Sequence, residues 1–404
     1  MDQLPIPERS HNGGVRDGMQ TSGTVDDVIT LTLIGIVISG GDFKHDCLKW
    51  WRATWALAKE LKLNQEVEDN PASVATPEAG NDSEQSTPAG GTAIKITEEE
   101  KEERRRIWWL LFIADRHLAL SFNGPLHIFE AECHLYQPLD DITWQESDPE
   151  VAKDRFYGPQ TTCTGVGLFE FFLPLMVILG DIVDIHHRSY HPRFGRLENS
   201  AAISQVEITL ERYEHSLRLL EGTSRSPVAN SIMNSTTSDY NRRLPSIHQI
   251  NQFGTHPLSP SSHSTSPAME SRKQIVIAYS SQLLHVLYIL LHGKWDPISM
   301  LDDLDNWTKS SSFAKCASHS VSAAEAVSRI LDYDPELSFM PYLFGIYLLH
   351  GSFILLLFAD KMQIEANPTV RVACETMIRA HEVCVATLNT EYQVSRASHS
   401  NRVL

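Results

Sequence analysis

Apolar residues recur at helical spacing along most of this chain, and residues 97–125 show the pattern most clearly. Thr97 and Glu100 stand three residues apart, as in a capping box, so a helix is expected to begin there. The apolar positions that follow are three, four and seven residues apart: Ile107, Leu110, Leu111, Ala114 and Leu118. Gly124 and Pro125 break the pattern. We therefore expect a helix that begins in water, ends buried and forms the centre of an α-helical domain.

The same spacing predicts further helices on both sides of this one. They cover residues 43–63, 169–187, 199–221, 274–292, 311–331, 341–360 and 369–391. Residues 28–39 are apolar and partly β-branched, and fit either a strand or a buried helix. Pro174 lies inside an expected helix, so a kink or a helix start is expected there. Residues 127–148, rich in Pro and Asp, are expected to be irregular. Because the sequence contains no alternating strands and no Gly-rich strand-to-helix turns, the predicted fold class is all-α.

Polar, low-complexity stretches divide the helical pattern into parts. Residues 1–24 are interpreted as a disordered N-terminal segment and residues 66–93 as a surface loop. Residues 223–272 are rich in Ser and Pro and too long for an ordinary loop, which favours a disordered insertion. The sequence thus predicts a helical domain in two parts, followed by a tail: residues 25–222, 273–393 and 394–404.

Composition disfavours several classes of function for this chain. The 404-residue chain carries a formal net charge of −17, which disfavours nucleic-acid binding by the chain itself, since phosphate binding needs a basic face. Its six cysteines include no pair at C-x-x-C spacing, so the sequence encodes neither a zinc cluster nor a redox dithiol. Scattered cysteines in a chain of this length fit free, buried thiols in a reducing compartment. The first residues show no basic-then-apolar signal sequence.

Residues 342–358 form a long uncharged stretch that raises the question of a membrane span. The stretch is about a turn short of a comfortable span. It contains Gly345, His350 and Gly351, and Asp360 follows almost at once. These features favour a buried core helix, so no membrane partner is expected. A membrane protein is the minor alternative and would show detergent-dependent solubility.

Among the stretches of the sequence, a cluster of aspartates and histidines is the strongest candidate for a metal site. Asp181, Asp184, His187 and His191 are three, three and four residues apart, so on a helix they could share one face and bind a divalent metal. The interpretation that we favour is a helix end, where cationic side chains suit the negative end of the helix dipole and pair with the aspartates. A helical metal-dependent enzyme built on these four residues is kept as the alternative function.

Three consecutive arginines, Arg104, Arg105 and Arg106, resemble a nucleic-acid or nuclear-import patch. Acidic residues precede them, so intrahelical pairs from Glu100 to Arg104 and from Glu102 to Arg106 are the favoured interpretation. The sequence shows no phosphate-cradling glycine loop and no nucleophile elbow. We therefore assign no catalytic, cofactor-binding or metal residue and expect no enzyme.

Residues 99–126 resemble the middle homology region of fungal zinc-binuclear-cluster transcription factors. The positions that match the family pattern are Arg104, Arg105, Arg106, Trp108, Trp109, Phe112, Asp115, Arg116, Ala119 and Pro125. Further blocks are similar to the xylanolytic activators, one branch of this family. These blocks are residues 26–30, 50–66, 167–195 and 341–393.

This resemblance implies a multi-helix regulatory domain in the nucleus that controls xylanase and cellulase genes. The implied partners are the transcription machinery or co-regulators, and a sugar-derived inducer. The helices around Trp108 and Trp109 could line a pocket for such an inducer, but plain core is favoured. DNA would be bound only through the family's N-terminal zinc cluster, which nothing here matches, so no cofactor is assigned. Residues 394–404 depart from the family pattern, and we expect a fragment or a mispredicted gene model.

Overall fold

The computed structural model describes eight stretches of the chain. These are residues 23–39, 44–67, 96–146, 155–191, 193–222, 267–302, 306–362 and 368–388. The segments expected to be disordered or aberrant at 1–22, 223–266 and 394–404 lie outside the described residues, as does most of the expected loop at 66–93. The chain divides into two compact units, Met1–Lys62 and Leu63–Leu404.

The first unit is a helical pair. Its two helices are α1 (Val25–Ser39) and α2 (Lys44–Glu60). The apolar residues 28–39 therefore form a helix and not a strand. Gly35 lets the helices approach closely, because a Cβ atom there would meet the indole of Trp51 at 3.0 Å. At the start of α1, Thr24 Oγ1 accepts from the Asp27 amide at 3.2 Å.

The second unit contains the other described elements. Its longer helices are α3 (Glu98–Phe122), α5 (Leu168–Arg188), α6 (Ser200–Gly222), α7 (Pro267–His292), α9 (Ser311–Tyr333), α10 (Pro341–Met362) and α11 (Pro368–Leu388). The short elements are η1 (Glu130–Glu132), α4 (Asp141–Glu146), β1 (Tyr190–His191), β2 (Gly195–Arg196), α8 (Pro297–Asp302) and η4 (Trp307–Lys309). The two strands form a small antiparallel hairpin, and the described fold is otherwise all-α.

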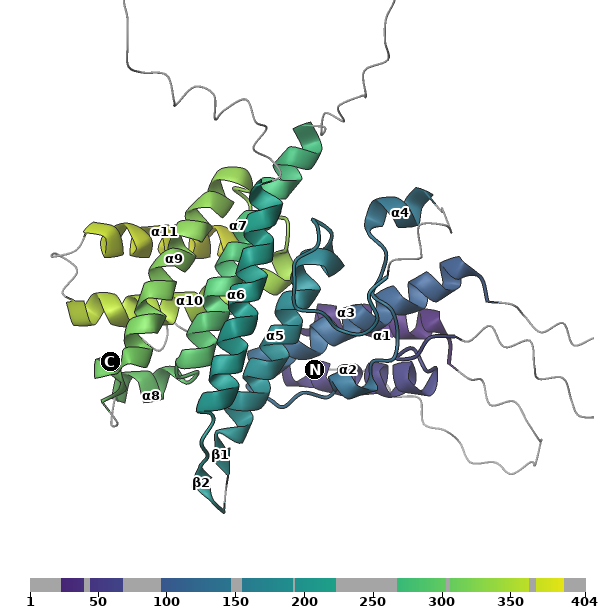
Figure 1. Ribbon diagram of the computed structural model, residues 1–404, viewed down its shortest axis with the longest axis horizontal. Helices are drawn as coiled ribbons and strands as arrows, with labels where there is room; N and C mark the ends of the chain where they lie inside the picture. The colour runs from purple at the N-terminus through teal and green to yellow at the C-terminus, as the bar shows by residue number, and fades with distance from the viewer. Residues whose placement is uncertain are drawn as a thin grey trace, which may run out of the picture. The chain divides into compact units, whose positions relative to one another are not determined.

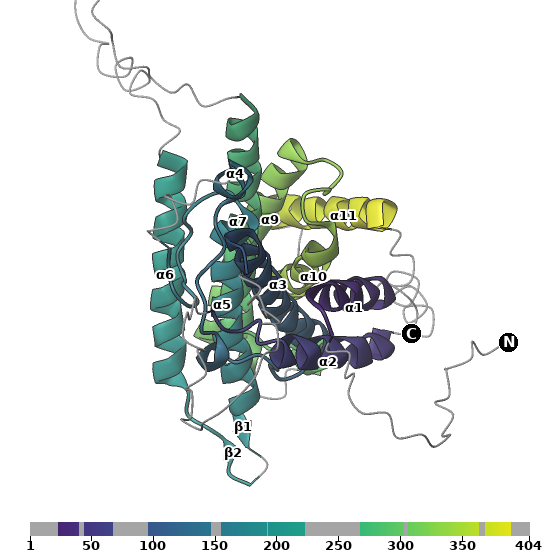
Figure 2. The ribbon, with the colours of Figure 1, turned by 90° about the vertical axis from the view of Figure 1, so that its right-hand side faces the viewer.

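The helix at the centre of this unit is α7, not α3 as the sequence suggested. It packs against α5, α6, α9 and α10, while α3 packs against α5 and α10. Figures 1 and 2 both show α6 and α7 running side by side. The helix also begins at Pro267, so residues 267–272 are helical and not part of a disordered insertion. Proline at the first helical position supports this start, because its missing N–H has no intrahelical partner there in any case.

Pro174 lies inside α5 without ending it. A proline cannot donate to the carbonyl four residues earlier, which here belongs to Glu170. That carbonyl instead accepts a hydrogen bond from the amide of Thr164 at 3.1 Å. The helix therefore begins at Leu168, ahead of the proline, because the preceding loop supplies the missing donor. Similarly, the described part of the expected irregular stretch, residues 127–146, contains the short elements η1 and α4.

Two helices among the described residues are long and apolar enough to cross a membrane. In α7, 78% of the most apolar window is buried inside the protein, as in the core helix of a globular fold. In the second, Tyr342–Asp360 of α10, half of the window is buried. Most of the remaining residues of this window are partly exposed, and Leu356 is 53% exposed.

Candidate functional site

Four of the α3 residues that carry the family resemblance, Arg106, Trp108, Trp109 and Asp115, make hydrogen bonds to one irregular segment. This segment comprises residues 127–141, and we call it the strap. At its first residues, the buried Asp115 carboxylate accepts hydrogen bonds from the amides of His127 and Ile128, each at 3.0 Å. Arg116 neutralises this carboxylate through a contact of 3.1 Å. The Asp-Arg dipeptide therefore fixes the turn by which the chain leaves α3 and folds back along it.

The two tryptophans hold the middle of the strap. The indole N–H of Trp108 donates to Cys133 Sγ at 3.3 Å, and that of Trp109 donates to the Tyr136 carbonyl at 2.9 Å. Both side chains are fully buried. Their apolar surface lies in the core and their single donors are used within the chain. The structure thus supports core and not a pocket at this double tryptophan.

The last residues of the strap are held by Glu102 and Arg106. Glu102 Oε1 accepts from the Leu139 amide at 2.7 Å, and Arg106 donates to the Leu139 carbonyl at 2.7 Å. Arg106 also pairs with Asp141 at 2.9 Å and lies over the ring of Trp144. The contacts run from Asp115 at the start of the strap to Glu102 at its end, so the strap runs antiparallel to α3.

Glu102 is also the centre of a cluster of arginines. Its carboxylate, only 2% exposed, contacts Arg155 at 3.0 Å and both Arg105 and Arg106 at 3.3 Å. The pair between Glu102 and Arg106 is the one that their spacing predicted. Burial lowers the pKa of Arg155, and so does the charge of Arg105. A buried carboxylate among three guanidinium groups offsets this unfavourable concentration of positive charge.

A second carboxylate, Glu66, ties a more distant segment to the same cluster. It forms a bidentate pair with Arg105, through Nε at 2.8 Å and Nη2 at 2.7 Å. Glu66 also accepts from the Tyr136 amide at 2.7 Å. Burial lowers the pKa of Arg105, but the hydrogen bonds and charges of Glu66 and Glu102 outweigh it, so that the pKa is raised. Arg105 and Arg106 are therefore internal connectors and not a surface for phosphate groups.

Arg116 shows how closely α3 and α5 pack. Its guanidinium lies 3.3 Å from the centre of the Phe112 ring and is almost completely buried. A Cβ atom at Gly180 of α5 would lie 3.3 Å from Arg116 Nε, so the glycine leaves room for the guanidinium. Burial lowers the pKa of Arg116, and the charge of Asp115 opposes this shift.

The aspartate and histidine cluster does not form a metal site. Asp184 pairs with Arg188 one turn later, and His187 Nε2 contacts the Gly124 carbonyl at 2.8 Å. Partial desolvation raises the pKa of Asp181, and His191 lies beyond the helix in β1. Among the described residues no group of three or more His, Cys, Asp or Glu side chains is placed to hold a metal ion. The stretch is a helix end, and the alternative of a metal-dependent enzyme is not supported.

The cysteines likewise do not fit the zinc of the family's binuclear cluster. All six cysteines are buried, and none of them is in a disulfide. Burial raises the pKa of the Cys133 thiol to about 11, with only partial opposition from the Trp108 hydrogen bond, and that of Cys316 to about 12. Such thiols stay protonated at neutral pH, whereas zinc binds the thiolate.

One serine–histidine pair has the form of a catalytic dyad but not its hydrogen bonding. Ser352 Oγ lies 2.8 Å from His381 Nε2 and donates its own proton to the Leu348 carbonyl at 2.8 Å. The imidazole is thus the donor of the pair, and the serine is not activated. The contact joins α10 to α11.

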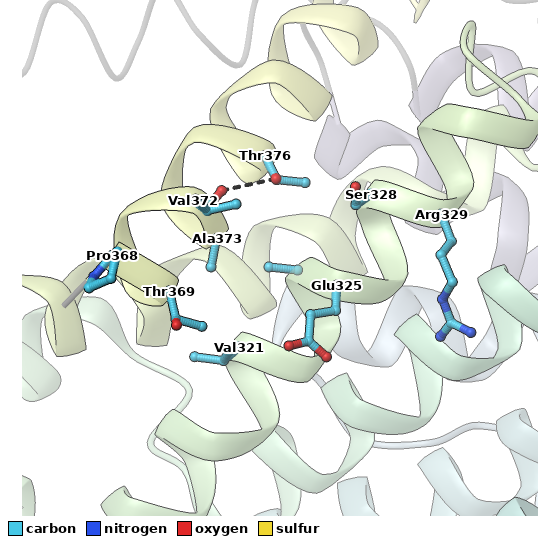
Figure 3. A pocket seen from close by; sticks show the side chains of 10 residues that line it. Val321, Glu325, Ser328, Arg329, Pro368, Thr369, Val372, Ala373 and Thr376 are labelled. Atoms are coloured by element: carbon cyan, nitrogen blue, oxygen red, sulfur yellow. Dashed lines mark hydrogen bonds between the residues drawn. The ribbon is translucent and has the colours of Figure 1, made fainter.

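A groove of about 640 Å³ lies between α9 and α11 (Figure 3). Small apolar residues and three hydroxyls line most of it, and Glu325 and Arg329 are its charged residues. The Thr376 hydroxyl is engaged with the Val372 carbonyl at 2.9 Å. No aromatic side chain is among its described lining residues, so it lacks the aromatic surface common in small-molecule sites.

The sequence did not predict that Glu66 and Arg155 belong to the Glu102 cluster. Glu66 and Arg155 stand far from α3 in sequence, and no local spacing marks them as partners. The pair expected between Glu100 and Arg104 stays a prediction, while Glu100 Oε2 accepts from the Thr97 amide at 2.7 Å as the expected capping box requires.

Comparison with known proteins shows which family the chain resembles. Residues 31–218 match the model of the fungal specific transcription factor domain. The chain is 45% identical to the xylanolytic transcriptional activators xlnR of Aspergillus flavus and Aspergillus fumigatus, and 44% identical to that of Aspergillus niger. Each match covers 93% of this chain. No solved structure matches.

The chain spans about two fifths of the length of these relatives, 41% to 42%. The matched domain crosses the division between the two compact units, so the expected domain boundaries stay a prediction. The matched residues include α3, the strap and α5. Several residues that the family resemblance singled out make the contacts among these three elements. The chain carries a fungal specific transcription factor domain and is related over nearly its whole length to the xylanolytic transcriptional activators.

Proposed function

We propose that this chain is the regulatory region of a nuclear activator of genes for xylan and cellulose degradation. The observation that carries the proposal is the 45% identity to xylanolytic activators over 93% of the chain. The region would respond to a sugar-derived signal and contact the transcription machinery or co-regulators, without chemistry of its own. It requires no cofactor.

The net charge of the chain and the pairing of two of its arginines support a role that does not involve DNA contact. The formal net charge is −17, and Arg105 and Arg106 are engaged with Glu66, Glu102 and Asp141. DNA binding needs basic side chains that are free to replace counterions on phosphates. In this proposal, DNA is reached through a zinc cluster that these residues do not supply.

We expect the purified chain to form no specific complex with xylanase promoter DNA in a gel-shift titration at physiological salt. Any weak binding should vanish as salt rises, because it would be electrostatic. A complex that resists salt and is lost on competition with the same promoter, but not with unrelated DNA, would contradict the proposal.

A reporter experiment tests the regulatory role itself. The full chain is fused to an unrelated DNA-binding domain and placed over a reporter gene in a fungal host. Reporter output should change between growth on glucose and growth on xylose. A Glu103→Gln fusion, altered at an exposed position beside the Glu102 cluster, should keep this response. Output that is identical on both sugars would count against a sugar-responsive region.

A further inference from the structure

Gln282 lies in the middle of α7, and its side chain has no hydrogen-bond partner among the described residues. The residue is 0% exposed, and both its amide oxygen and its amide nitrogen are buried without a partner. A buried amide that makes no hydrogen bond destabilises the folded state, because water would satisfy it in the unfolded chain. The folded chain therefore bears a cost at this position that an apolar side chain of similar size would avoid.

The contacts of α7 on either side of Gln282 show that this face of the helix is turned towards α9 (Figure 1). Three residues earlier, the Tyr279 hydroxyl donates to the carboxylate of Asp334, the C-cap of α9, at 2.8 Å. Three residues later, His285 Nδ1 lies 3.1 Å from His319 Nδ1 of α9. Residues three apart on a helix share a face, so Gln282 lies between these two polar contacts. Its neighbours on α7 are paired across the helix contact, and Gln282 is not.

The part of α9 that lies opposite Gln282 contains several small side chains. The two helices run antiparallel, because the earlier residue of α7 contacts the later residue of α9. Position 282 therefore lies opposite the middle of the stretch 319–334. Three of the buried residues there are alanines, Ala323, Ala324 and Ala326. Because an alanine side chain buries little apolar surface, these residues offset little of the cost of the unpaired amide.

We propose that the contact at Gln282 is a weak point built into the fold, at which α9 separates from α7 without unfolding of the whole chain. In the open form, water hydrogen-bonds the Gln282 amide, which the closed form leaves unpaired. Local openings of this kind have free energies below that of global unfolding. The opening gives the chain a two-state element, and it does not depend on the regulatory function proposed above.

Native-state hydrogen exchange of the full chain at low urea concentrations tests the proposal. The amide of Val327 in α9 should exchange at least about tenfold faster than that of Ile178 in α5, and its rate should depend less on urea. Both residues are fully buried within helices. Equal rates with the same urea dependence would overturn the proposal, because α9 would then open only when the whole chain unfolds.

Gln282→Met tests whether the unpaired amide favours the opening. Methionine is similarly long and flexible but has no amide, so the variant should slow exchange at Val327 at least about tenfold. Gln282→Leu repeats the test with a side chain of different shape, so that poor packing of one replacement does not decide the result. Slowing at Val327 by either replacement supports the proposal.

Gln205→Met is the matched control, since Gln205 of α6 is exposed. This variant should leave exchange at Val327 unchanged. Equal slowing by Gln205→Met would overturn the proposal, because the effect would then not come from the buried amide. Exchange at Val327 that is faster or unchanged in both the Gln282→Met and the Gln282→Leu chains would also overturn it.

Discussion

Replacing Glu102 with glutamine is expected to lower the free energy of unfolding by about 3–5 kcal/mol, the usual cost of removing one partner from a buried charge cluster. Glutamine keeps the size of the side chain but removes the charge that Arg105, Arg106 and Arg155 share. The side-chain oxygen can still accept from the Leu139 amide, so the loss comes mainly from the uncompensated guanidinium groups. Urea unfolding followed by tryptophan fluorescence measures the change.

Glu103→Gln is the matched control for this substitution. The change is chemically identical and one residue away, but Glu103 is exposed on the same helix. Its effect should stay within about 0.5 kcal/mol, as for most surface substitutions. If the Glu102 and Glu103 variants were equally stable, the arginine cluster would not depend on the Glu102 charge.

Acidification is expected to destabilise the chain by several kcal/mol between about pH 6.5, the ordinary pKa of histidine, and pH 4. Burial lowers the pKa of five histidines to about 4: His117, His186, His285, His319 and His350. A histidine with a lower pKa in the folded chain takes up its proton first in the unfolded chain. Stability is therefore present above pH 6.5 and is lost as the pH falls towards 4.

Some acids act in the opposite direction but are fewer. Burial raises the pKa of Glu130, Glu170 and Asp181, so these groups take up protons in the folded chain first and gain stability as the pH falls. The histidines outnumber them, and the net change should be a loss. Domains are stable by only about 5–15 kcal/mol, so this loss is a large part of the total.

Urea unfolding at a series of pH values measures this dependence. His117→Phe removes one buried titrating ring that lies beside Tyr342 and Tyr347, and should make the loss of stability with falling pH shallower. His134→Phe changes an exposed ring and should leave the slope as it was. Stability that stays level or rises from pH 6.5 to 4 would show that the buried histidines do not dominate.

Features set by neighbours in sequence were predictable, and features set by distant residues were not. The capping box of Thr97 and Glu100 and the pair of Glu102 with Arg106 follow from helix geometry alone. The role of Glu66 was not predictable, because its partners Arg105 and Tyr136 are distant in sequence. Pro174 was expected to start or kink a helix, because the donor from Thr164 that satisfies the Glu170 carbonyl lies outside the helix pattern.

The start of α7 was placed too late for a different reason. Residues 267–272 follow a Ser- and Pro-rich stretch, and composition favoured disorder up to Arg272. Proline at the first helical position, followed by Ala, Met and Glu, was the local signal for a helix start. For α3, the sequence identified the family but not what its signature residues contact. Those contacts indicate that signature residues of α3 hold the strap in place.

Hydrogen exchange at the strap tests this assignment most directly. The amides of Ile128, Tyr136 and Leu139 donate to the carboxylates of Asp115, Glu66 and Glu102, and should exchange at least about 100-fold more slowly than in an unfolded chain. In the Glu102→Gln chain, under conditions where it remains folded, protection at Leu139 should fall more than protection at Ile128. The acceptors of the Ile128 and Leu139 amides lie on α3. Exchange of these two amides at the rate of an unfolded chain in the wild-type protein would show that α3 does not hold the strap.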